Sequence, residues 1–260
     1  MNVNDKRIVI TGAASGIGAA LLNRLTRFRC QILAVDRQPI TQATTRRDQA
    51  QVTTLHADLS TEAGNASVFD AAQSQMGGID IFIANAGFAH YGLAKSLDWQ
   101  GMERLFSVNV LAPLYAITHM QQFNPTSPYM VVVTASAMAK LALPGYAHYA
   151  GTKAALDRFA QAYRHELPAN GHLMLVYPIA TRTQFFQKRA ATDAPRPFPS
   201  QSAGFVANRI ISGIKNNRQR VNPSPGFRIY GALTRLFPPL GRIYRAYADY
   251  QLKQWLKKQP

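Results

Sequence analysis

Cysteine is scarce in this 260-residue sequence. Its one cysteine, Cys30, excludes an intrachain disulfide, and no group of histidines and cysteines has the spacing of a zinc site, so we expect no metal. A single thiol fits a reducing compartment, and no apolar signal-peptide core precedes the first predicted strand at residues 7–11. We therefore expect a cytoplasmic protein. No apolar run reaches the roughly eighteen residues that a membrane span needs.

Acidic residues are also few. There are 13 of them against 29 lysines and arginines, which gives a net charge of +16. From Phe205 to the end, eleven lysines and arginines stand against Asp249 alone, a net charge of +10. Such a field favours a polyanionic partner, either anionic lipid, nucleic acid or a phosphorylated ligand. The alternative is a basic solvated surface without a dedicated partner.

Apolar, β-branched runs alternate with longer helical stretches, and 47% of the residues are hydrophobic. Several runs are apolar almost throughout, which is typical of parallel strands covered on both faces. This alternation predicts an α/β fold with a doubly wound parallel sheet. The expected strands are residues 7–11, 31–35, 52–57, 79–84, 129–134 and 172–177. The expected helices are residues 17–28, 61–75, 99–122 and 147–167.

Polar and proline-rich segments interrupt this alternation in three places. Residues 41–48 indicate a loop or a short irregular helix. The proline-rich stretch 193–199 separates the sheet region from a helical segment near 201–215, either as a flap over an active site or as a plain surface excursion. Two prolines at 238–239 divide the basic tail into two helices. We therefore predict one dinucleotide-binding and catalytic domain, residues 1–222, with a helical extension, residues 223–260.

Three glycines follow the first predicted strand within Thr11–Gly18 (TGAASGIG), and a helical run begins at once. Glycines allow the backbone to turn tightly and a pyrophosphate to approach it. The new helix then presents unpaired N–H groups and the positive end of its dipole to that phosphate. The position of the glycines between a strand and a helix makes the dinucleotide interpretation much stronger than a glycine triplet alone.

The second predicted strand ends at Asp36. A carboxylate there can accept hydrogen bonds from the adenosine ribose and repel a 2′-phosphate, which favours NAD. The neighbouring Arg37 could instead accommodate that phosphate, which keeps NADP open. The alternative for Asp36 is a turn or helix-capping aspartate.

Ser136 follows the strand at 129–134, and Tyr149 comes thirteen residues later with Lys153 four positions beyond it. Residues i and i+4 share one face of a helix. A phenol with a pKa near 10 is a poor base at neutral pH, and a neighbouring ammonium lowers that pKa. We therefore expect acid–base chemistry on Tyr149, with Ser136 holding the substrate oxygen.

Together these motifs resemble the short-chain dehydrogenase/reductase family, whose fold is a Rossmann-like doubly wound sheet. The resemblance covers roughly residues 5–183 and rests on several motifs in the family's order. They are Thr11–Gly18 (TGxxxGxG), Asp36 and Asp58, Asn85-Ala86-Gly87, Asn109, Ser136 and Tyr149-x-x-x-Lys153.

The resemblance implies roles for four catalytic residues. Tyr149 would give or take the proton, and Lys153 would lower its pKa and bind the nicotinamide ribose. Ser136 would orient the substrate, and Asn109 would hold a water that links Lys153 to solvent.

The resemblance also implies a cofactor site, with NAD favoured over NADP. Its three glycines would form the pyrophosphate turn, with a backbone N–H from Ile17. Asp58 would contact adenine, and the segment 85–87 would line the cofactor and steady the sheet. The implied cofactor-binding residues are Gly12, Ser15, Gly16, Ile17, Gly18, Asp36, Arg37, Asp58, Leu59, Asn85, Ala86, Gly87, Tyr149, Lys153, Pro178 and Thr183.

Two positions depart from the family's pattern. The family usually has Pro-Gly after its sixth strand, and this chain has Pro178-Ile179, so a side chain could narrow the nicotinamide pocket. Gly151, inside the predicted catalytic helix, lowers its helix propensity by up to about 1 kcal/mol against alanine. We expect activity to survive both. His90 and Tyr91 are candidates for substrate contact, whereas His148 is not expected to face Tyr149.

The basic tail carries apolar stripes flanked by cations. Arg228 and Arg235 are expected opposite the first stripe, and residues 241–258 add aromatic side chains among further cations. Such helices suit a membrane interface, so contact through 226–258 is one interpretation. The tail also looks like the C-terminal extensions of family members that handle lipophilic alcohols and ketones. The alternatives are packing on its own core or on another subunit; no motif supports nucleic acid. The first stripe contains Ile229, Tyr230, Leu233, Leu236, Phe237 and Leu240.

The sequence therefore predicts an NAD(P)-dependent oxidoreductase that transfers a hydride between the cofactor and an alcohol or carbonyl substrate, which the tail indicates to be lipophilic. We expect a short-chain alcohol dehydrogenase or carbonyl reductase, assembled as a homo-dimer or tetramer. The alternative from another class is a catalytically idle nucleotide-binding scaffold or sensor. The intact set of acid–base residues argues against it.

Overall fold

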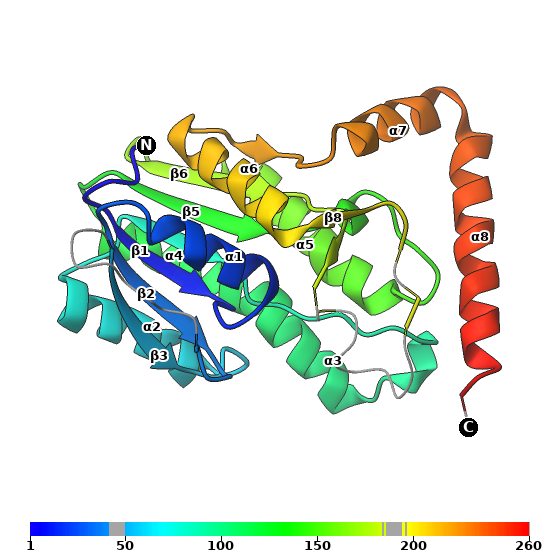
Figure 1. Cartoon of the computed structure of the whole chain (residues 1–260), viewed down its shortest axis with the longest axis horizontal. Coiled ribbons are helices and arrows are strands. Elements are labelled where there is room, and N and C mark those ends of the chain that lie inside the picture. The colour runs from blue at the N-terminus through cyan, green and yellow to red at the C-terminus, as the bar shows by residue number, and fades with distance from the viewer. Residues whose placement is uncertain (42–49, 184, 186–193, 196, 260) are drawn as a thin grey trace.

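The computed structural model describes residues 1–41, 50–183, 185, 194–195 and 197–259. Within them, strands and helices alternate along the first two thirds of the chain, and helices follow at the end (Figure 1). The strands are β1 (Arg7–Thr11), β2 (Gln31–Asp36), β3 (Gln51–His56), β4 (Ile81–Ala84), β5 (Tyr129–Thr134), β6 (Gly171–Val176), β7 (Ala180–Arg182), β8 (Ser200–Ser202) and β9 (Arg220–Val221). The α-helices are α1 (Gly16–Leu25), α2 (Glu62–Met76), α3 (Trp99–Phe106), α4 (Ala112–Phe123), α5 (Ala147–Tyr163), α6 (Ala203–Lys215), α7 (Pro225–Leu236) and α8 (Pro238–Leu256). Shorter turns are η1 (Ala94–Ser96), η2 (Ser107–Leu111) and η3 (Ala137–Ala139).

The main sheet has seven parallel strands in the order β3-β2-β1-β4-β5-β6-β9. The order reverses between β1 and β4, where the chain turns from one half of the sheet to the other. In open α/β sheets, ligands bind at this crossover, outside the carboxyl ends of the strands. The predicted doubly wound parallel fold is confirmed.

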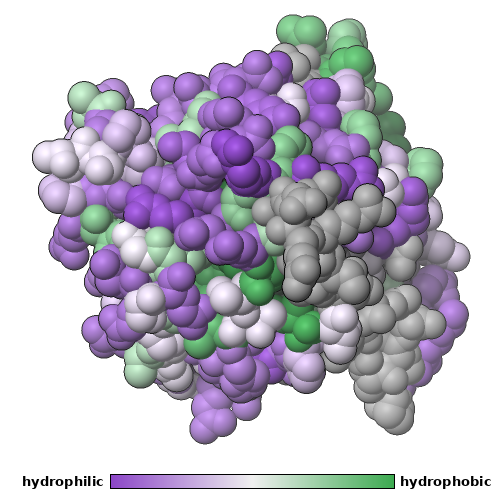
Figure 2. All heavy atoms as spheres, turned by 60° about the vertical axis from the view of Figure 1, so that its left-hand side comes forward, coloured by the Kyte–Doolittle hydropathy of each residue, from purple (hydrophilic) through white to green (hydrophobic). Residues whose placement is uncertain are grey.

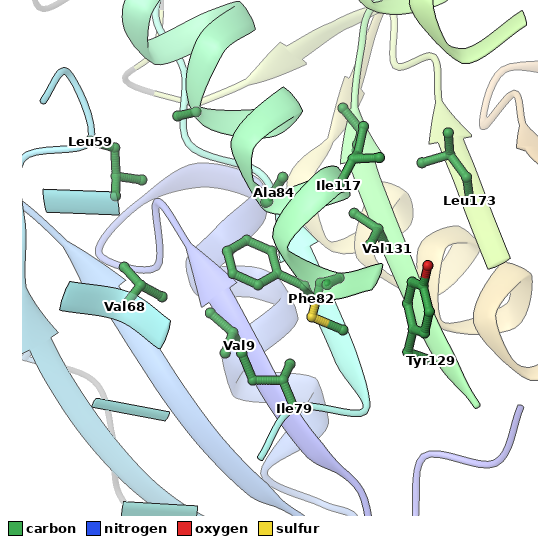
Figure 3. Packing of buried hydrophobic residues seen from close by; sticks show 14 of the residues in the cluster. Val9, Leu59, Val68, Ile79, Phe82, Ala84, Ile117, Tyr129, Val131 and Leu173 are labelled. Carbon is green, nitrogen blue, oxygen red and sulfur yellow. The ribbon is translucent and has the colours of Figure 1, made fainter. Parts of the chain in front are cut away.

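Helices cover both faces of the sheet, which explains why its central strands are apolar almost throughout. On one face, Ile8 and Ile10 of β1 pack with buried residues of α1 and α6. On the other, Val9 packs with residues of α2, α4 and α5. Figure 3 shows this second core, where Phe82 and Ile117 lie among side chains from several elements.

Several boundaries differ from the sequence expectation for local reasons. The helix expected near 201–215 starts at Ala203, because the Ser202 hydroxyl caps it by accepting a hydrogen bond from the Phe205 N–H at 3.2 Å. The three residues before α6 form β8, which pairs in parallel with β7. The long helix expected over 99–122 is three elements: α3, the π-turn η2 and α4.

The remaining expected elements are present with small shifts at their ends, as at β4, which begins at Ile81 rather than at residue 79. Strands β7, β8 and β9, only two or three residues long, are absent from the sequence prediction. The loop expected at 41–48 lies outside the described residues except for its first position.

Helices α7 and α8 form the C-terminal extension, and the helical conformation is interrupted between them at Phe237, one residue before Pro238. This confirms the division expected at the two prolines. The inner face of α8 packs on the body, since Ala248 and Leu252 are buried in a cluster with Tyr91 and Tyr146. The expected alternative of packing on its own core is therefore correct for this face.

The outer face of the extension is exposed and apolar. Figure 2 shows hydrophobic atoms gathered at the upper right of the molecule, at the height where Figure 1 places α7. The side chains of Arg228 and Arg235 lie outside the described part of the structure, so their expected position opposite the stripe stays a prediction. No helix among the described residues has the length and apolar character needed to cross a bilayer. The large exposed apolar side chains of this face are Ile229, Leu233, Leu236, Phe237, Leu240, Ile243, Tyr247 and Tyr250.

Candidate active site

A cavity of about 490 Å³ lies at the carboxyl ends of the central strands. It brings together most of the residues that the sequence predicted for the site. Gly18 and Asn109 do not line it. The predicted residues that line it are Gly12, Ser15, Gly16, Ile17, Asp36, Arg37, Asp58, Leu59, Asn85, Ala86, Gly87, Ser136, Tyr149, Lys153, Pro178 and Thr183.

The glycine turn after β1 needs glycine at each of its three positions. Gly12 and Gly16 have φ angles of +69° and +59°, a region that side chains disfavour. A Cβ added to Gly18 would lie 1.9 Å from the Gly12 carbonyl oxygen. Ser15 precedes α1 with extended backbone, and its side chain makes no capping hydrogen bond. The N-terminal turn of α1 therefore opens onto the cavity wall that Ser15, Gly16 and Ile17 form.

Asp36 ends β2 and braces this turn. One carboxylate oxygen accepts the Ala14 N–H at 2.9 Å, and the other accepts the Gln38 N–H at 2.9 Å. The expected alternative of a turn aspartate is thus part of its structure. The carboxylate still lines the cavity, and each oxygen keeps a lone pair for a ligand. Arg37 follows it at the same wall with an exposed side chain.

Asp58 follows β3 at the rim of the cavity. It accepts hydrogen bonds from the Ser60 N–H at 3.0 Å and hydroxyl at 2.8 Å, and it pairs with Arg104 at 3.1 Å. The bond from the Ser60 backbone leads the interactions that lower the pKa of Asp58. Asp58 is therefore held as a carboxylate at this edge.

The segment 85–87 ties β4 to its neighbours. The Asn85 side-chain amide donates to the Thr11 carbonyl at 3.1 Å, and its oxygen accepts from the Thr134 hydroxyl at 3.2 Å. The Thr11 hydroxyl accepts the N–H groups of Asn85 and Ala86, both at 3.0 Å. These bonds join the ends of β1, β4 and β5, so the segment does steady the sheet where it meets the cavity.

Ser136, Tyr149 and Lys153 come together at the cavity, and all three are buried. The side chains of Ser136 and Tyr149 are hydrogen-bonded. The Lys153 Nζ lies 5.7 Å from the centre of the Tyr149 ring and donates to the Thr134 carbonyl at 2.9 Å. The i, i+4 spacing on α5 has thus placed the phenol and the ammonium on one face, as expected.

The pKa values of this pair are governed by burial. Burial raises the pKa of Tyr149 to about 12, although the hydrogen bond with Ser136 acts to lower it. Burial also lowers the pKa of Lys153 to about 8. The net shift of Tyr149 is opposite to the expected lowering, because the loss of water around the phenol outweighs the hydrogen bond. The phenol keeps its proton at neutral pH.

Asn109 lies behind these residues in the π-turn η2 and is fully buried. Its side-chain amide donates to the Phe88 carbonyl at 2.8 Å, and its oxygen accepts the Phe88 N–H at 3.0 Å. The same amide lies 3.2 Å from the Thr152 hydroxyl, next to Lys153. Asn109 therefore braces the loop after β4 against α5. Its expected water-holding role stays a prediction.

The two departures from the family pattern have different surroundings. Ile179 lines the cavity beside Pro178, so a side chain does stand where the family has glycine. The Pro178 carbonyl accepts the Ala137 N–H at 2.8 Å, which joins this wall to the segment after Ser136. Gly151 has no atom within 4 Å of an added Cβ and leaves the site untouched.

Three further candidates lie away from the cavity wall. The His90 ring is 3.1 Å from the Ser96 hydroxyl, and Tyr91 packs against Tyr146 with ring centres 4.7 Å apart. Neither residue lines the cavity, and their expected substrate contact stays a prediction. The His148 ring contacts the Ala94 carbonyl at 3.0 Å, away from Tyr149 as expected. Among the described residues, no three histidine, cysteine or acidic side chains gather as metal ligands.

Sequence reasoning missed most of the apolar wall. Phe185 packs edge-on against Tyr149 with ring centres 5.9 Å apart. The proline-rich segment borders the cavity through three of its described residues, so it is more than a surface excursion. The extension reaches the cavity as well, which no local pattern signals. The apolar and aromatic residues added to the wall include Leu141, Leu143, Phe185, Pro197, Phe198, Phe227, Tyr230 and Tyr244.

A buried network behind α5 was also missed. Asp157, one turn after Lys153, accepts the Tyr177 hydroxyl at 2.7 Å and Lys140 Nζ at 2.5 Å. Gln161 donates to it at 2.8 Å. Desolvation opposes the charge of Asp157, but the bonds from Lys140 and Tyr177 lower its pKa overall. Its i+4 position after Lys153 was a signal available in the sequence.

Known proteins resemble this chain in both sequence and fold. The family model described as short chain dehydrogenase matches residues 6–194. A fatty acyl-CoA reductase from Mycobacterium tuberculosis is 28% identical over 233 residues, which cover 86% of this chain and 78% of that protein. A short-chain dehydrogenase/reductase from Burkholderia phymatum, solved with NAD, is 20% identical with a TM-score of 0.81, covering 92% of this chain and 96% of that one.

A short-chain dehydrogenase from Sphingobium yanoikuyae, solved with NADPH, is 24% identical with a TM-score of 0.76, covering 90% of this chain and 95% of that one. These two structural likenesses concern the fold, and the family match extends over most of the sequence. The chain belongs to the short-chain dehydrogenase family of NAD(P)-dependent oxidoreductases.

Proposed function

We propose that the protein is an active dehydrogenase or reductase that interconverts a lipophilic alcohol and its carbonyl compound. The observation that carries this proposal is the convergence of Ser136, Tyr149 and Lys153 on the cavity that the glycine turn opens. An acid–base pair and a dinucleotide turn at one cavity are the two requirements of this reaction.

The residues of the turn fit a nicotinamide dinucleotide. A side chain at Gly12 would occupy disfavoured backbone space and press on Ala86, so its absence leaves backbone open to a pyrophosphate. Asp36, Asp58 and the segment 85–87 would hold the adenosine end and the central part of the cofactor. When bound, the cofactor supplies or accepts the hydride.

The proton chemistry falls to Tyr149. In carbonyl reduction, a hydride adds to the substrate carbon and the phenol gives its proton to the substrate oxygen, which yields the alcohol. The raised pKa of Tyr149 keeps that proton available at neutral pH. Ser136, hydrogen-bonded to the phenol, would hold the same oxygen. Lys153, with its pKa near 8, would carry a positive charge at neutral pH, and this charge would stabilise the phenolate that remains after Tyr149 has given up its proton.

The wall of the cavity supports a lipophilic substrate. Its apolar and aromatic side chains gather on the side of Tyr149, where Met138, Leu143 and Phe185 belong to the same cluster as the phenol. The printed name of the Mycobacterium tuberculosis relative, a fatty acyl-CoA reductase, points to the same class of compound.

Measurement of absorbance at 340 nm tests the reaction. Alcohols, aldehydes and ketones of graded chain length are supplied with NAD(H) or NADP(H), and we expect turnover with at least part of the apolar series. Tyr149→Phe should reduce kcat by at least about a hundredfold, since acid–base catalysis contributes on that order. Tyr250→Phe, on the exposed face of α8, is the matched control. Full turnover by Tyr149→Phe would refute this mechanism.

NAD is the favoured cofactor because the Asp36 carboxylate lines the cavity at the end of β2. Asp36→Asn keeps one oxygen to accept a backbone N–H but removes the charge that repels a 2′-phosphate. We expect the ratio of Kd values to move toward NADP⁺ in this variant, and away from it in Arg37→Ala. If the wild type and both variants have the same ratio of Kd values for NAD⁺ and NADP⁺, Asp36 and Arg37 do not select the cofactor.

A catalytically idle nucleotide-binding scaffold is the second candidate. The extension with its large exposed apolar face favours it, since such a face is typical of partner binding. The two candidates separate in one experiment. A scaffold binds NADH in a fluorescence titration without turning over any member of the substrate series.

We also propose a cytoplasmic homo-oligomer that contacts a membrane surface through residues 226–258. The exposed apolar residues of α7 and α8 lie among exposed cations, including Arg242 and Arg245, which suits anionic lipid. Co-flotation with liposomes tests the contact, and sedimentation velocity tests the assembly. A triple variant, Leu236→Ser with Phe237→Ser and Ile243→Ser, should lose binding to anionic liposomes. Trp99→Ser, equally exposed but on α3, should keep it.

A further inference from the structure

The extension lines the cavity and also forms part of the molecular surface. Phe227 and Tyr230 of α7 and Tyr244 of α8 all line it, although they stand more than seventy residues after Tyr149. Their rings form a chain of contacts: Phe227 and Tyr230 are 6.4 Å apart between centres, and Tyr230 and Tyr244 are 5.9 Å apart. The two helices thus close the cavity with an aromatic wall.

Tyr244 connects this wall to the rest of the cavity. Its hydroxyl donates to the Phe198 carbonyl at 2.8 Å, and Phe198 lines the cavity too. Its ring packs against the buried cluster that contains Tyr149 and Leu143. Burial raises the pKa of Tyr244, so its hydroxyl remains a donor at neutral pH. A single residue of α8 therefore holds the proline-rich segment and faces the substrate side of the site.

The opposite end of the cavity is built differently. Gly12, Asp36 and Asp58 present backbone groups and carboxylates there, which suit a polar nucleotide. The reacting phenol of Tyr149 adjoins the apolar part of the wall, because it contacts Phe185 and belongs to the same apolar cluster. An apolar substrate tail attached to the reacting carbon has the aromatic wall of the extension as its natural partner.

We propose that Phe227 is the specificity-determining residue that sets the longest apolar chain the site accepts, and that Tyr244 holds this wall in place. This inference rests on the proposed oxidoreductase function and names its substrate class: a primary or secondary alcohol, or its carbonyl compound, with an unbranched apolar tail. Phe227 limits the length of the tail by occupying volume. Tyr244 keeps the wall closed through its bond to the Phe198 carbonyl.

The test is a chain-length profile of kcat/KM for straight-chain alcohols from four to sixteen carbons. Phe227→Ala removes a ring from the wall, so we expect the optimum to move to longer chains. In this variant, kcat/KM for alcohols longer than the wild-type optimum should rise about tenfold relative to kcat/KM for shorter alcohols. One methylene group bound in an apolar pocket changes kcat/KM by about tenfold or more. Tyr244→Phe keeps the ring but loses its hydroxyl, so KM should rise for every length with the optimum unchanged.

Tyr250→Ala is the matched control, because Tyr250 is an exposed aromatic residue of α8, the helix that carries Tyr244, and it does not line the cavity. It should keep the wild-type profile. Phe227→Leu, a smaller change, gives the same direction of shift if Phe227→Ala fails to fold. Identical profiles for wild type and both Phe227 variants would overturn the inference while leaving the oxidoreductase function intact.

A binding assay separates the two failures. Straight-chain alkanols of the same lengths compete with the fluorescent dye Nile red for the protein in the presence of NADH. If wild type turns over no alcohol but Phe227→Ala shifts this competition to longer chains, the proposed reaction fails and the wall is supported. If neither turnover nor competition depends on Phe227, the wall has no role in selection.

Discussion

The glycine turn after β1 and the C-terminal extension reach the same cavity by different physical means. The turn depends on its backbone: the positive φ angle of Gly12 and the closeness of Gly18 to the Gly12 carbonyl exclude a side chain at these two positions. The extension contributes mainly side chains, those of Phe227, Tyr230 and Tyr244. Asp36 accepts and Asn85 donates the hydrogen bonds that brace the turn, whereas α8 is held to the body mainly by apolar contacts.

This difference determines which residues of the site tolerate substitution. A side chain at Gly12 or Gly18 would press on backbone atoms, which cannot move aside as a flexible side chain can. An apolar interface tolerates exchanges of similar volume, because its contacts are not directional. We therefore expect the nucleotide end of the site to be rigid in sequence and the substrate end to be open to change.

The largest effect is expected from Gly18→Ala. The new Cβ would stand 1.9 Å from the Gly12 carbonyl oxygen, so the turn must move apart. We expect a loss of at least about 3 kcal/mol in the free energy of unfolding, at the upper end of single substitutions, and loss of dinucleotide binding. Urea unfolding and an NADH titration measure the two.

Gly151→Ala is its control within α5. No atom lies within 4 Å of that added Cβ, and alanine has the better helix propensity. Stability should therefore rise by up to about 1 kcal/mol with unchanged NADH affinity. If the two glycine variants behave alike, the contrast between turn and helix has no basis.

A second test concerns the buried polar network of the body. Asp157→Ala leaves the Tyr177 hydroxyl buried without its acceptor and Lys140 without its partner. We expect a loss of about 1–3 kcal/mol in urea unfolding, because the Tyr177 hydroxyl stays buried without an acceptor, whereas the Lys140 side chain, 45% exposed, regains water. Asp157→Asn, which keeps one acceptor oxygen, should lose less. A change below about 0.5 kcal/mol in the alanine variant would contradict this account.

The extension itself offers a smaller pair of effects. Leu252→Ala removes a buried contact of α8, and we expect a loss of about 2 kcal/mol in the docking of this helix, at the low end of core truncations because the site is peripheral. Ile243→Ser changes a side chain that is 66% exposed and should stay within about 0.5 kcal/mol. Hydrogen exchange of α8 amides reads the docking directly. Equal protection in both variants would mean that the inner face does not hold the helix.

The last expected effect is a dependence on pH. The pKa of Lys153 is lowered in the folded protein from 10.5 to about 8, so between these values the unfolded chain binds the extra proton. Stability then rises with pH across this window. Tyr149 acts in the opposite sense above pH 10, since its pKa is raised to about 12. Urea unfolding at pH 7 and pH 9.5 should show a larger gain for wild type than for Lys153→Met.

Other titrating groups cancel in that difference between wild type and variant. The same gain in both proteins would show that Lys153 is not the group responsible.

The sheet and the nucleotide end could be predicted because their signals are local. Apolar runs such as Met130–Val133 identify buried strands without knowledge of their neighbours, and the glycines of the turn stand within eight residues of one another. The spacing of Tyr149 and Lys153 gave their common face for the same reason. The short strands β7 and β8 could not be found, because two three-residue segments whose paired residues are twenty positions apart acquire their pairing only in the folded chain.

The substrate end could not be predicted, since its wall is assembled from distant segments. Tyr244 and Phe198 are 46 residues apart and carry no shared pattern. The raised pKa of Tyr149 was missed for a related reason: the sequence indicates the neighbouring ammonium but not the degree of burial, which depends on everything packed around the phenol.

The π-turn at Ser107–Leu111 makes the number of residues in this segment a structural requirement. A π-turn holds about one residue more than an α-turn, and each residue of an α-helix advances by about 100°. Deleting one residue between Phe106 and Ala112 would restore a regular helix, and it would also rotate α3 against α4 and carry Asn109 off the Phe88 backbone. Surface loops accept insertions and deletions, but the segment Ser107–Leu111 is expected to accept neither.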